Sequence, residues 1–508
     1  MSDAKAEPEG YKNFGSFHTA SVEHMLAAPA ADWSRPPMPF DEAAIVDAAC
    51  ARVRAAEAGA APAESDDGGA VAELGRGTAD ALPLGRALVD GGAFFVEKDW
   101  CFVNHGAFGG ALAPAVEAAQ AWQKHVERQP LRFIDRELFP HVVHSLREIA
   151  VCMASSQQLE RAAGSASGAA SDDAPTTPPP CDVVFLPNAT TGLNVAIAAA
   201  PLGPSRPAFT LSICYGALKK MLTHACAIKG AEAIVHDTPF PPPTDAADSP
   251  EAFDDWVVSL YEEHLPEGAG LAVVDAVTSN TALALPVRRV AEVCARKGVP
   301  LLVDGAHALG TVGGCGPDSG ATWYVTNCHK WWSSPRGLGA MWVAPAAQAD
   351  TRPLVVSHGY GSGFASEFVW DGCRDYSAQL AVPAAAAFRR AMGGEARVAA
   401  YCRALLRLAV SRLTARWGTS TPVPAGCFSH MALVGVPDAS VHPSGRGGAA
   451  TSAHAKALQD RLHESFRVEC PVKCHGGRLF VRISAAAYNC PADYDRLAEA
   501  VEACAAEE

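Results

Sequence analysis

Short apolar runs alternate with helical stripes through the middle of the chain. Residues 182–186 and 271–275 each have the apolar pattern of a buried strand. Residues 287–298 carry apolar side chains at 287, 290, 291 and 294, charged side chains between them and a final glycine, which is the spacing of an amphipathic helix. The chain continues directly into another apolar run, residues 299–303. Strand, helix and strand in this order form a βαβ unit, so the pattern predicts a mainly parallel sheet with helices on both faces.

The pattern changes after about residue 350. Helical stripes over 378–392 and 396–417 are followed by a few strands, among them 479–483. This second part has the pattern of a smaller α+β domain. We therefore predict an N-terminal extension that is partly disordered (1–90), a large domain (91–350) and a small C-terminal domain (351–508).

Four stretches are built mostly from Gly, Pro, Ser, Ala and Asp. Such stretches bury too little apolar area to offset the entropy of ordering them, so they predict loops or disorder. Periodic segments resume after each one, which indicates insertions into surface loops of a single fold. The stretches are residues 60–70, 161–180, 238–250 and 438–454.

Composition and charge narrow the class of protein. The chain has 508 residues, 49% of them apolar and 19% charged, which is enough to bury a large core. Its 41 basic and 55 acidic side chains give a formal net charge of −14, which disfavours nucleic acid or an anionic membrane as the main partner. No apolar run is long enough for a membrane helix and no signal peptide is evident, so we expect a soluble, cytoplasmic protein, with an organelle not excluded.

The sixteen cysteines are scattered and none forms a C-x-x-C motif. The one tight cluster, residues 470–475, lacks further metal ligands at a suitable spacing. We therefore predict no metal site and expect reduced thiols.

Polar residues follow three of the predicted strands, where ligands bind in α/β sheets. Residues 188–192 (Asn-Ala-Thr-Thr-Gly) would open a helix and suit a phosphate, although an ordinary capped helix is an alternative. Residues 275–280 follow the next strand, and a plain polar turn is the alternative there. Asp304 stands at the end of the third strand with His307 three residues on, where the alternative is a capping aspartate with a surface histidine.

Lys330 lies in the segment Asn327-Cys-His-Lys-Trp-Trp332, beside two tryptophans. Burial among them would lower its pKa, which an amine needs in order to form a Schiff base. The alternative is a lysine whose stem lies on tryptophan with its ammonium in water. Together with Asp304 and the phosphate-type turn, the pattern favours a pyridoxal 5′-phosphate (PLP) site. Lys330 would carry the Schiff base, and Asp304 would partner the ring nitrogen.

At this point the chain resembles a known family, the class V aminotransferase-like PLP enzymes of fold type I. The resemblance covers about residues 95–500, and it is strongest to the branch with isopenicillin N epimerase and plant L-cysteine desulfhydrase. It rests on Val103-Asn-His-Gly-Ala-Phe-Gly109, Arg128-Gln-Pro130, Asn188-Ala-Thr-Thr191, Asp304-Gly-Ala-His-Ala-Leu-Gly310, Asn327-Cys-His-Lys-Trp331, Val356-Ser-His-Gly-Tyr-Gly361, Trp370-Asp-Gly-Cys-Arg-Asp-Tyr-Ser377 and Val481-Arg-Ile-Ser484 with Tyr488-Asn489.

The resemblance implies a fold and a set of residue roles. The fold is a PLP-dependent transferase of fold type I, with a mainly parallel sheet in the large domain and a smaller α+β C-terminal domain. Lys330 would be the proton-transfer base and Asp304 would keep the ring nitrogen protonated. The other roles are His307 and Thr278 near the phenolic oxygen, Thr190, Thr191, Asn327 and His329 at the phosphate, Tyr215 stacked on the ring, Arg482 on the substrate carboxylate, and Asn104 and His105 at the substrate entrance.

Two of these assignments have plain alternatives, a strand-end tyrosine for Tyr215 and an exposed strand arginine for Arg482. The family's Gly-Thr-Arg-Asp is Gly372-Cys-Arg-Asp375 here. In relatives that threonine reaches the phosphate of the neighbouring subunit. Arg374, which the chain retains, is expected at the cofactor, and the resemblance implies a homodimer.

The implied activity is a carbon–sulfur lyase on an L-cysteine-like amino acid. It would release sulfide, pyruvate and ammonia by α,β-elimination. The same residues would also serve an epimerase, a lyase on a larger cysteine sulfoxide conjugate or an aminotransferase. A non-catalytic binding protein with this fold is the alternative from another class.

Overall fold

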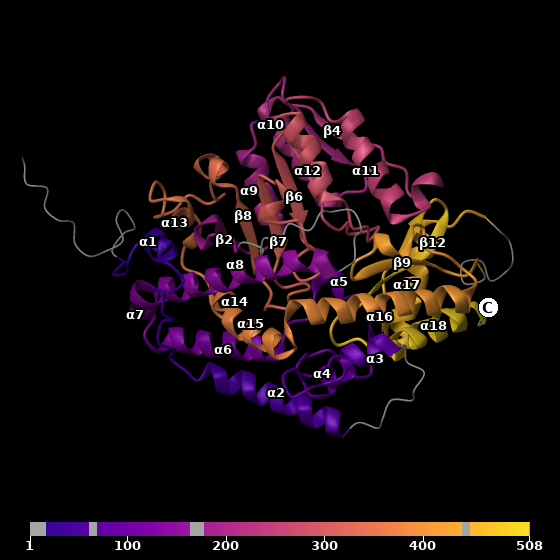
Figure 1. Cartoon of the computed structure of the whole chain (residues 1–508), viewed down its shortest axis with the longest axis horizontal. Helices are drawn as coiled ribbons and strands as arrows, with labels where there is room; N and C mark the ends of the chain where they lie inside the picture. The colour runs from indigo at the N-terminus through magenta and orange to yellow at the C-terminus, as the bar shows by residue number, and fades with distance from the viewer. Residues whose placement is uncertain (1–16, 60–68, 163–176, 439–447, 507–508) are drawn as a thin grey trace, which may run out of the picture.

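The computed structural model describes residues 17–59, 69–162, 177–438 and 448–506 (Figure 1). Most of the loop-like stretches predicted at 60–70, 161–180 and 438–454 lie outside these residues. The fourth, 238–250, is a loop that contains one short 3-10 turn, Asp245–Ala247.

A seven-stranded sheet forms the centre of the molecule. Its strands lie in the order β2, β8, β7, β6, β5, β3, β4. Neighbours are parallel from β7 through β6, β5 and β3 to β4, whereas β8 is antiparallel to both of its neighbours. The predicted mainly parallel sheet is therefore confirmed. The strands are β2 (Val183–Leu186), β3 (Ala208–Leu211), β4 (Ala233–His236), β5 (Leu271–Asp275), β6 (Leu301–Gly305), β7 (Trp323–Asn327) and β8 (Gly339–Val343).

Helices cover both faces of this sheet, because alternate strand residues point to opposite sides. Along β2, Val184 and Leu186 belong to one apolar cluster, while Val183 and Phe185 belong to the other. The first cluster packs with α9 and α10, and the second with α8, α11 and α12. The predicted helix at 287–298 is α12. These helices are α8 (Leu138–Ala162), α9 (Ala189–Ala199), α10 (Gly216–Lys229), α11 (Pro250–His264) and α12 (Val287–Arg296).

The C-terminal part carries a small antiparallel sheet in the order β11, β12, β9. In Figure 1 this sheet lies at the right of the large sheet, with α16, α17 and α18 beside it. A further short pair, β1 with β10, is parallel and joins residues far apart in the chain. The elements are β1 (Cys101–Phe102), β9 (Met431–Gly435), β10 (Val468–Glu469), β11 (Val472–His475), β12 (Arg478–Ser484), α13 (Phe364–Val369), α14 (Ser377–Leu380), α15 (Val382–Ala391), α16 (Gly394–Trp417), α17 (Ser452–Phe466) and α18 (Pro491–Ala506).

Helices also form in the described part of the first ninety residues. Val46, Ala49 and Val53 on α2 are buried in the main apolar cluster. Phe17 contacts Trp370 at 5.1 Å between ring centroids, so this segment packs on residues from the C-terminal half. The helices up to α8 are α1 (Val22–Ala27), α2 (Glu42–Ala58), α3 (Gly69–Gly75), α4 (Arg86–Asp90), α5 (His105–Phe108), α6 (Ala113–Arg128) and α7 (Pro130–Arg132), followed by the π-helical turn Phe133–Glu137.

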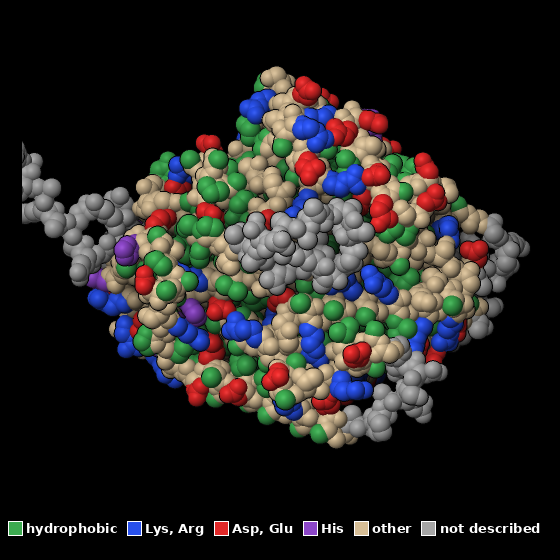
Figure 2. Space-filling view, viewed as in Figure 1, with side chains coloured by type: hydrophobic (Ala, Val, Ile, Leu, Met, Phe, Trp, Pro, Cys, Tyr) green, Lys and Arg blue, Asp and Glu red, His purple; other side chains and the backbone are tan. Residues whose placement is uncertain are grey.

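The surface carries both signs of charge. On the face drawn in Figure 2, basic and acidic side chains are interspersed and neither sign forms a continuous patch. None of the helices within the described ranges combines the length and apolar character needed to cross a membrane. All sixteen cysteines lie in the described residues as free thiols; most are buried, and Cys373 alone is exposed.

Candidate active site

The centre of the candidate site lies at the ends of three adjacent strands of the large sheet. Asp275 ends β5 and is paired in register with Asp304 on β6. Asn327 ends β7, the next strand, and Lys330 follows it by three residues. Because parallel strands bring their carboxyl ends to one edge, three segments of the chain deliver polar groups to the same place.

Lys330 projects toward His307. Its Nζ lies 3.1 Å from Nε2 of His307. Burial lowers the pKa of the Lys330 amine to about 8, although the Asp304 carboxylate acts against this by favouring the ammonium form. The Lys330 residue is only partly exposed, and its amine lies among protein groups beside His307.

The two strand-end carboxyls share one buried environment. Oδ1 of Asp304 accepts a hydrogen bond of 3.0 Å from the Ala306 amide, and Oδ2 of Asp275 accepts one of 3.0 Å from the Tyr215 amide. Burial raises the pKa of both carboxyls, and the charge of Asp304 raises that of Asp275 further. Within the described chain, Oδ1 of Asp275 has no hydrogen-bond partner. Asp304 is the member of the pair that remains ionised more readily.

His307 is buried, with 3% of its surface exposed, so the alternative of a surface histidine does not hold. Burial lowers its pKa well below the usual value, and the nearby Lys330 and Arg482 act in the same direction. The imidazole is therefore neutral at ordinary pH.

The phosphate-type turn forms at the start of α9. Asn188 caps this helix by accepting a 2.9 Å hydrogen bond from the Thr191 amide, so the capped-helix description is also correct. Oδ1 of Asn327 accepts one of 2.9 Å from the Ala189 amide, which brings the end of β7 to the same turn. Nδ1 of His329 lies 2.8 Å from the Leu338 carbonyl oxygen and donates to it. Thr190 and Thr191 lie in the first turn of α9.

Arg482 reaches the site from β12 of the small sheet. It is 4% exposed, so it is not an exposed strand arginine. Its guanidinium donates to the Ser279 carbonyl and, over 3.1 Å, to Oδ1 of Asn104. Among the described residues, its Nε meets no acceptor. Burial lowers the pKa of Arg482 to about 10, which still leaves it cationic.

Asn104 is oriented by a residue that the sequence did not single out. Its Nδ2 donates to Oε1 of Glu469 over 3.0 Å, so its Oδ1 faces Arg482. The other carboxylate oxygen of Glu469 lies 3.0 Å from Nδ1 of His463. No motif in the sequence marks Glu469, because it meets Asn104 only through the pairing of β1 with β10.

His105, predicted at the substrate entrance, is 1% exposed and has both ring nitrogens engaged. Its Nε2 lies 3.0 Å from the Lys330 carbonyl oxygen and its Nδ1 lies 2.9 Å from the Tyr488 hydroxyl. Since the carbonyl only accepts, Nε2 donates, and the ring holds the backbone of Lys330. Gly109 permits the close approach of the two segments, because a Cβ there would lie 2.1 Å from the His329 oxygen.

Three residues predicted to bind the cofactor make their contacts within their own segments or through the backbone. Tyr215 is 39% exposed at the start of α10, and its backbone amide contacts Asp275. The hydroxyl of Thr278 is buried and bonded within its own loop, 2.6 Å from that of Thr281. Arg374 pairs with Asp371 at 2.5 Å and lies over the ring of Tyr376, so its contacts are within its own segment.

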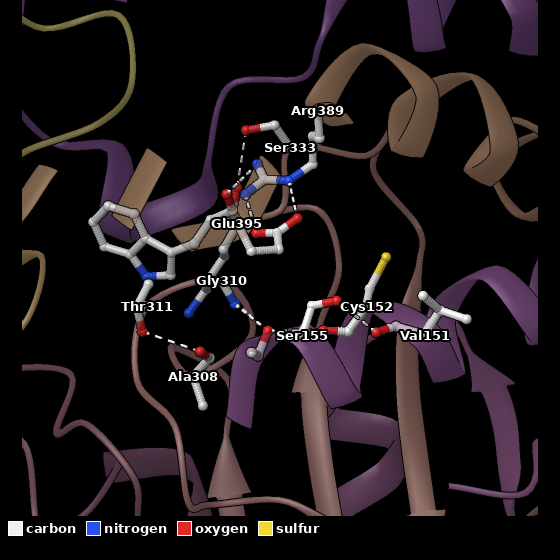
Figure 3. Close-up of polar contacts among 12 residues, drawn as sticks. Val151, Cys152, Ser155, Ala308, Gly310, Thr311, Ser333, Arg389 and Glu395 are labelled. Atoms are coloured by element: carbon white, nitrogen blue, oxygen red, sulfur yellow. Dashed lines mark hydrogen bonds and ion pairs between the residues drawn. The ribbon is translucent and has the colours of Figure 1, made fainter. Parts of the chain in front are cut away.

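A buried ion pair lies beside the segment that carries Lys330. Figure 3 shows the facing side chains of Arg389 and Glu395. Nε of Arg389 donates to Glu395 over 2.6 Å, and its NH1 donates to the Trp331 carbonyl over 3.2 Å. Both charged residues are at most 9% exposed. Sequence reasoning missed this pair, because the two residues carry no motif and lie at the junction of α15 and α16.

The chain is similar to several known proteins. No family model matches the chain. A protein named probable L-cysteine desulfhydrase, chloroplastic, from Arabidopsis thaliana is 28% identical over 427 residues, which cover 80% of this chain and 83% of that protein. Isopenicillin N epimerase from Amycolatopsis lactamdurans is 31% identical over 241 residues, or 44% of this chain and 58% of that protein.

Solved structures show the same fold. The cystine C–S lyase C-DES, in complex with its product cysteine persulfide, has a TM-score of 0.60 at 15% identity, covering 80% of this chain and 97% of that one. A C-DES variant with glycine covalently linked to PLP has a TM-score of 0.59 at 14% identity, covering 80% and 96%. The predicted fold type I architecture is confirmed, as is the resemblance to the desulfhydrase and epimerase branch.

Proposed function

Because the chain is homologous to proteins named L-cysteine desulfhydrase and to isopenicillin N epimerase, we propose that it is a PLP-dependent carbon–sulfur lyase. The reaction converts L-cysteine and water into sulfide, pyruvate and ammonia. The observation that carries this proposal is the amine of Lys330, which has a pKa of about 8 and lies 3.1 Å from His307 at the strand ends that also hold Asp304. A neutral amine in this position can form a Schiff base and can take a proton.

The residues at these strand ends fit PLP. The cofactor needs an amine, an acid for its ring nitrogen and an anion site for its phosphate, which are supplied by Lys330, Asp304 and the start of α9. Asn327 and His329 adjoin that helix start and would contribute to the anion site. PLP, when bound, supplies an electron sink for the carbanion formed at the substrate Cα.

Arg482 binds the substrate carboxylate in this proposal. Its Nε is buried without an acceptor among the described residues, and a carboxylate at this position would satisfy it. A planar guanidinium also fixes the direction of a carboxylate, which orients the Cα–H bond. Oδ1 of Asn104 holds the same guanidinium by accepting a hydrogen bond of 3.1 Å from its NH2 group.

Lys330 acts as the base in this proposal. Its amine removes the Cα proton, and the thiolate then leaves from Cβ with the electron pair of the carbon–sulfur bond. Asp304 would serve as the anion that keeps the ring nitrogen of bound PLP protonated. The three-carbon enamine that is released hydrolyses to pyruvate and ammonia, so no catalytic cysteine is required.

The test is to incubate the purified, PLP-loaded protein with L-cysteine and to measure sulfide and pyruvate. Equal amounts of both products support the lyase, and the Lys330→Ala variant should form neither. The absence of both products at full cofactor occupancy contradicts the proposal.

The match to isopenicillin N epimerase favours one other activity, exchange at Cα without elimination. A protein that incorporates deuterium at Cα of an amino acid in D₂O, and releases no sulfide from cysteine, would be an epimerase. The same incubation followed by mass spectrometry and chiral chromatography separates the two activities.

We also propose a cytoplasmic homodimer in which each site receives residues from both chains. Exposed apolar side chains support a partner surface, among them Val356 at 69% and Tyr360 at 61% exposure. We further propose that the chain divides near residue 350 into its large and small domains. Light scattering on the holoprotein tests the dimer, and limited proteolysis tests the division.

A further inference from the structure

His307 lies between an indole and an amine, one at each ring nitrogen. Its Nδ1 lies 3.2 Å from Nε1 of the Trp331 indole, and its Nε2 lies 3.1 Å from Nζ of Lys330. The imidazole and the indole are 3% and 7% exposed, so water does not replace either contact.

The first contact fixes where the ring proton lies. An indole N–H can only donate a hydrogen bond, so Nδ1 of His307 must accept it and cannot carry a proton. The neutral ring then has its proton on Nε2, which points at Lys330. The ring can then donate to the neutral form of the Lys330 amine, which exists above its lowered pKa of about 8.

We infer that Trp331 is a positioning residue that holds His307 in the Nε2–H tautomer, so that His307 offers the reaction centre a hydrogen-bond donor and not a base. This inference rests on the proposed function and deepens it. If His307 cannot accept a proton, Lys330 is left as the base that acts at the substrate Cα.

The surroundings keep the indole in this orientation. The Trp331 ring contacts those of His105 and His430, with centroids 5.0 and 5.4 Å away. Its carbonyl oxygen accepts the 3.2 Å hydrogen bond from Arg389, which the ion pair with Glu395 holds in place (Figure 3). Rotation of the indole would therefore disturb packing on two sides.

The charges that face His307 act in the same direction. Lys330 and Arg482 disfavour an imidazolium, and His105 contributes a weaker effect of the same sign. A proton on Nδ1 would also place two N–H groups against each other across the 3.2 Å contact with Trp331. The protonated ring is excluded by geometry as well as by charge.

The chain provides a matched control for the indole N–H. Trp332, the next residue, is 0% exposed, and within the described residues its Nε1 has no hydrogen-bond partner. Trp331→Phe and Trp332→Phe both remove part of a buried aromatic ring, but only the first removes a donor to His307.

The experiment is ¹⁵N NMR of the holoprotein labelled at histidine, with the His307 signals assigned by their loss in His307→Gln. Wild type and Trp332→Phe should show a protonated Nε2 and an unprotonated Nδ1. Trp331→Phe should show a mixture of tautomers, with imidazolium at the acid end of the pH range. A wild-type ring protonated at Nδ1, or an unchanged tautomer in Trp331→Phe, overturns the inference.

The visible absorbance of the bound cofactor gives a second readout. Its pH midpoint should move by about one unit in Trp331→Phe and by much less in Trp332→Phe. With L-cysteine, kcat should fall about tenfold in Trp331→Phe while KM changes less than twofold. An unmoved midpoint in Trp331→Phe counts against the inference. The NMR result does not depend on turnover, so failure of the lyase assay alone would overturn the proposed function and leave the tautomer assignment intact.

Discussion

The large-sheet side of the site and the small-sheet side are built by different means. Asp304 lies on β6 and Lys330 follows the neighbouring strand β7 by three residues, so strand pairing in one sheet brings both segments to the same edge. Arg482 is placed by β12 of another sheet, and its orientation depends on a series of side-chain hydrogen bonds through Asn104 to Glu469. Backbone pairing thus positions the groups proposed for chemistry, and side-chain hydrogen bonds position the group proposed for substrate binding. Changes on the first side should therefore alter kcat, and changes on the second should alter KM.

The largest effect is expected from Lys330→Ala. This variant loses both the Schiff-base amine and the proposed base, so the rate of sulfide release should fall by about 10⁴-fold or more. Sulfide and pyruvate assays measure the rate, and circular dichroism checks that the fold is kept. Activity within tenfold of wild type would show that another residue is the base.

Arg389→Met tests the support behind the large-sheet side. Removing this guanidinium leaves the buried carboxylate of Glu395 without its partner, so the free energy of unfolding should fall by about 3–5 kcal/mol. Urea denaturation followed by fluorescence measures the change. The double variant Arg389→Met/Glu395→Leu removes the buried charge as well and should regain most of the loss. If the double variant is no more stable than the single one, the unpaired carboxylate of Glu395 is not the cause of the lost stability.

Glu469→Met tests the small-sheet side. Without this carboxylate the Asn104 amide is free to turn its N–H₂ toward Arg482, so KM for cysteine should rise about tenfold while kcat changes less than twofold. Steady-state kinetics measures both. His463→Ala removes the partner on the far side of Glu469 and should change KM less than twofold. A fall in kcat with constant KM would show that the small-sheet side contributes to the chemical step and would contradict this prediction.

The smallest effect concerns pH. The pKa of Lys330 is lowered to about 8, so the rate at which PLP binds the apoprotein should rise through pH 8 and then level off, whereas an ordinary lysine would level only above about pH 10. The Asp304 carboxylate favours the ammonium form, so in Asp304→Asn the midpoint should move to lower pH. Stopped-flow absorbance after mixing with PLP measures both midpoints. A midpoint that rises in Asp304→Asn contradicts this sign.

The sequence predicted the large-sheet side well for a physical reason. Apolar strands of known period place their last residues at one edge, and Asp304, Asn188 and Lys330 all follow such strands. The same reasoning could not find Glu469 or Arg389. Glu469 meets Asn104 through a strand pair between distant segments, and Arg389 meets Glu395 at a helix junction that no motif marks. His105 stands in a recognisable motif, yet its ring is turned inward to hold the Lys330 carbonyl, a direction that no local pattern encodes.

The distribution of thiols has a practical consequence. Burial keeps most of the thiols away from reagents in solution, because a thiol must be accessible to react. The exposed side chain of Cys373 is then the first point of attachment for a maleimide dye under native conditions. Since it adjoins Arg374, a fluorophore there would report on that segment without any engineered cysteine.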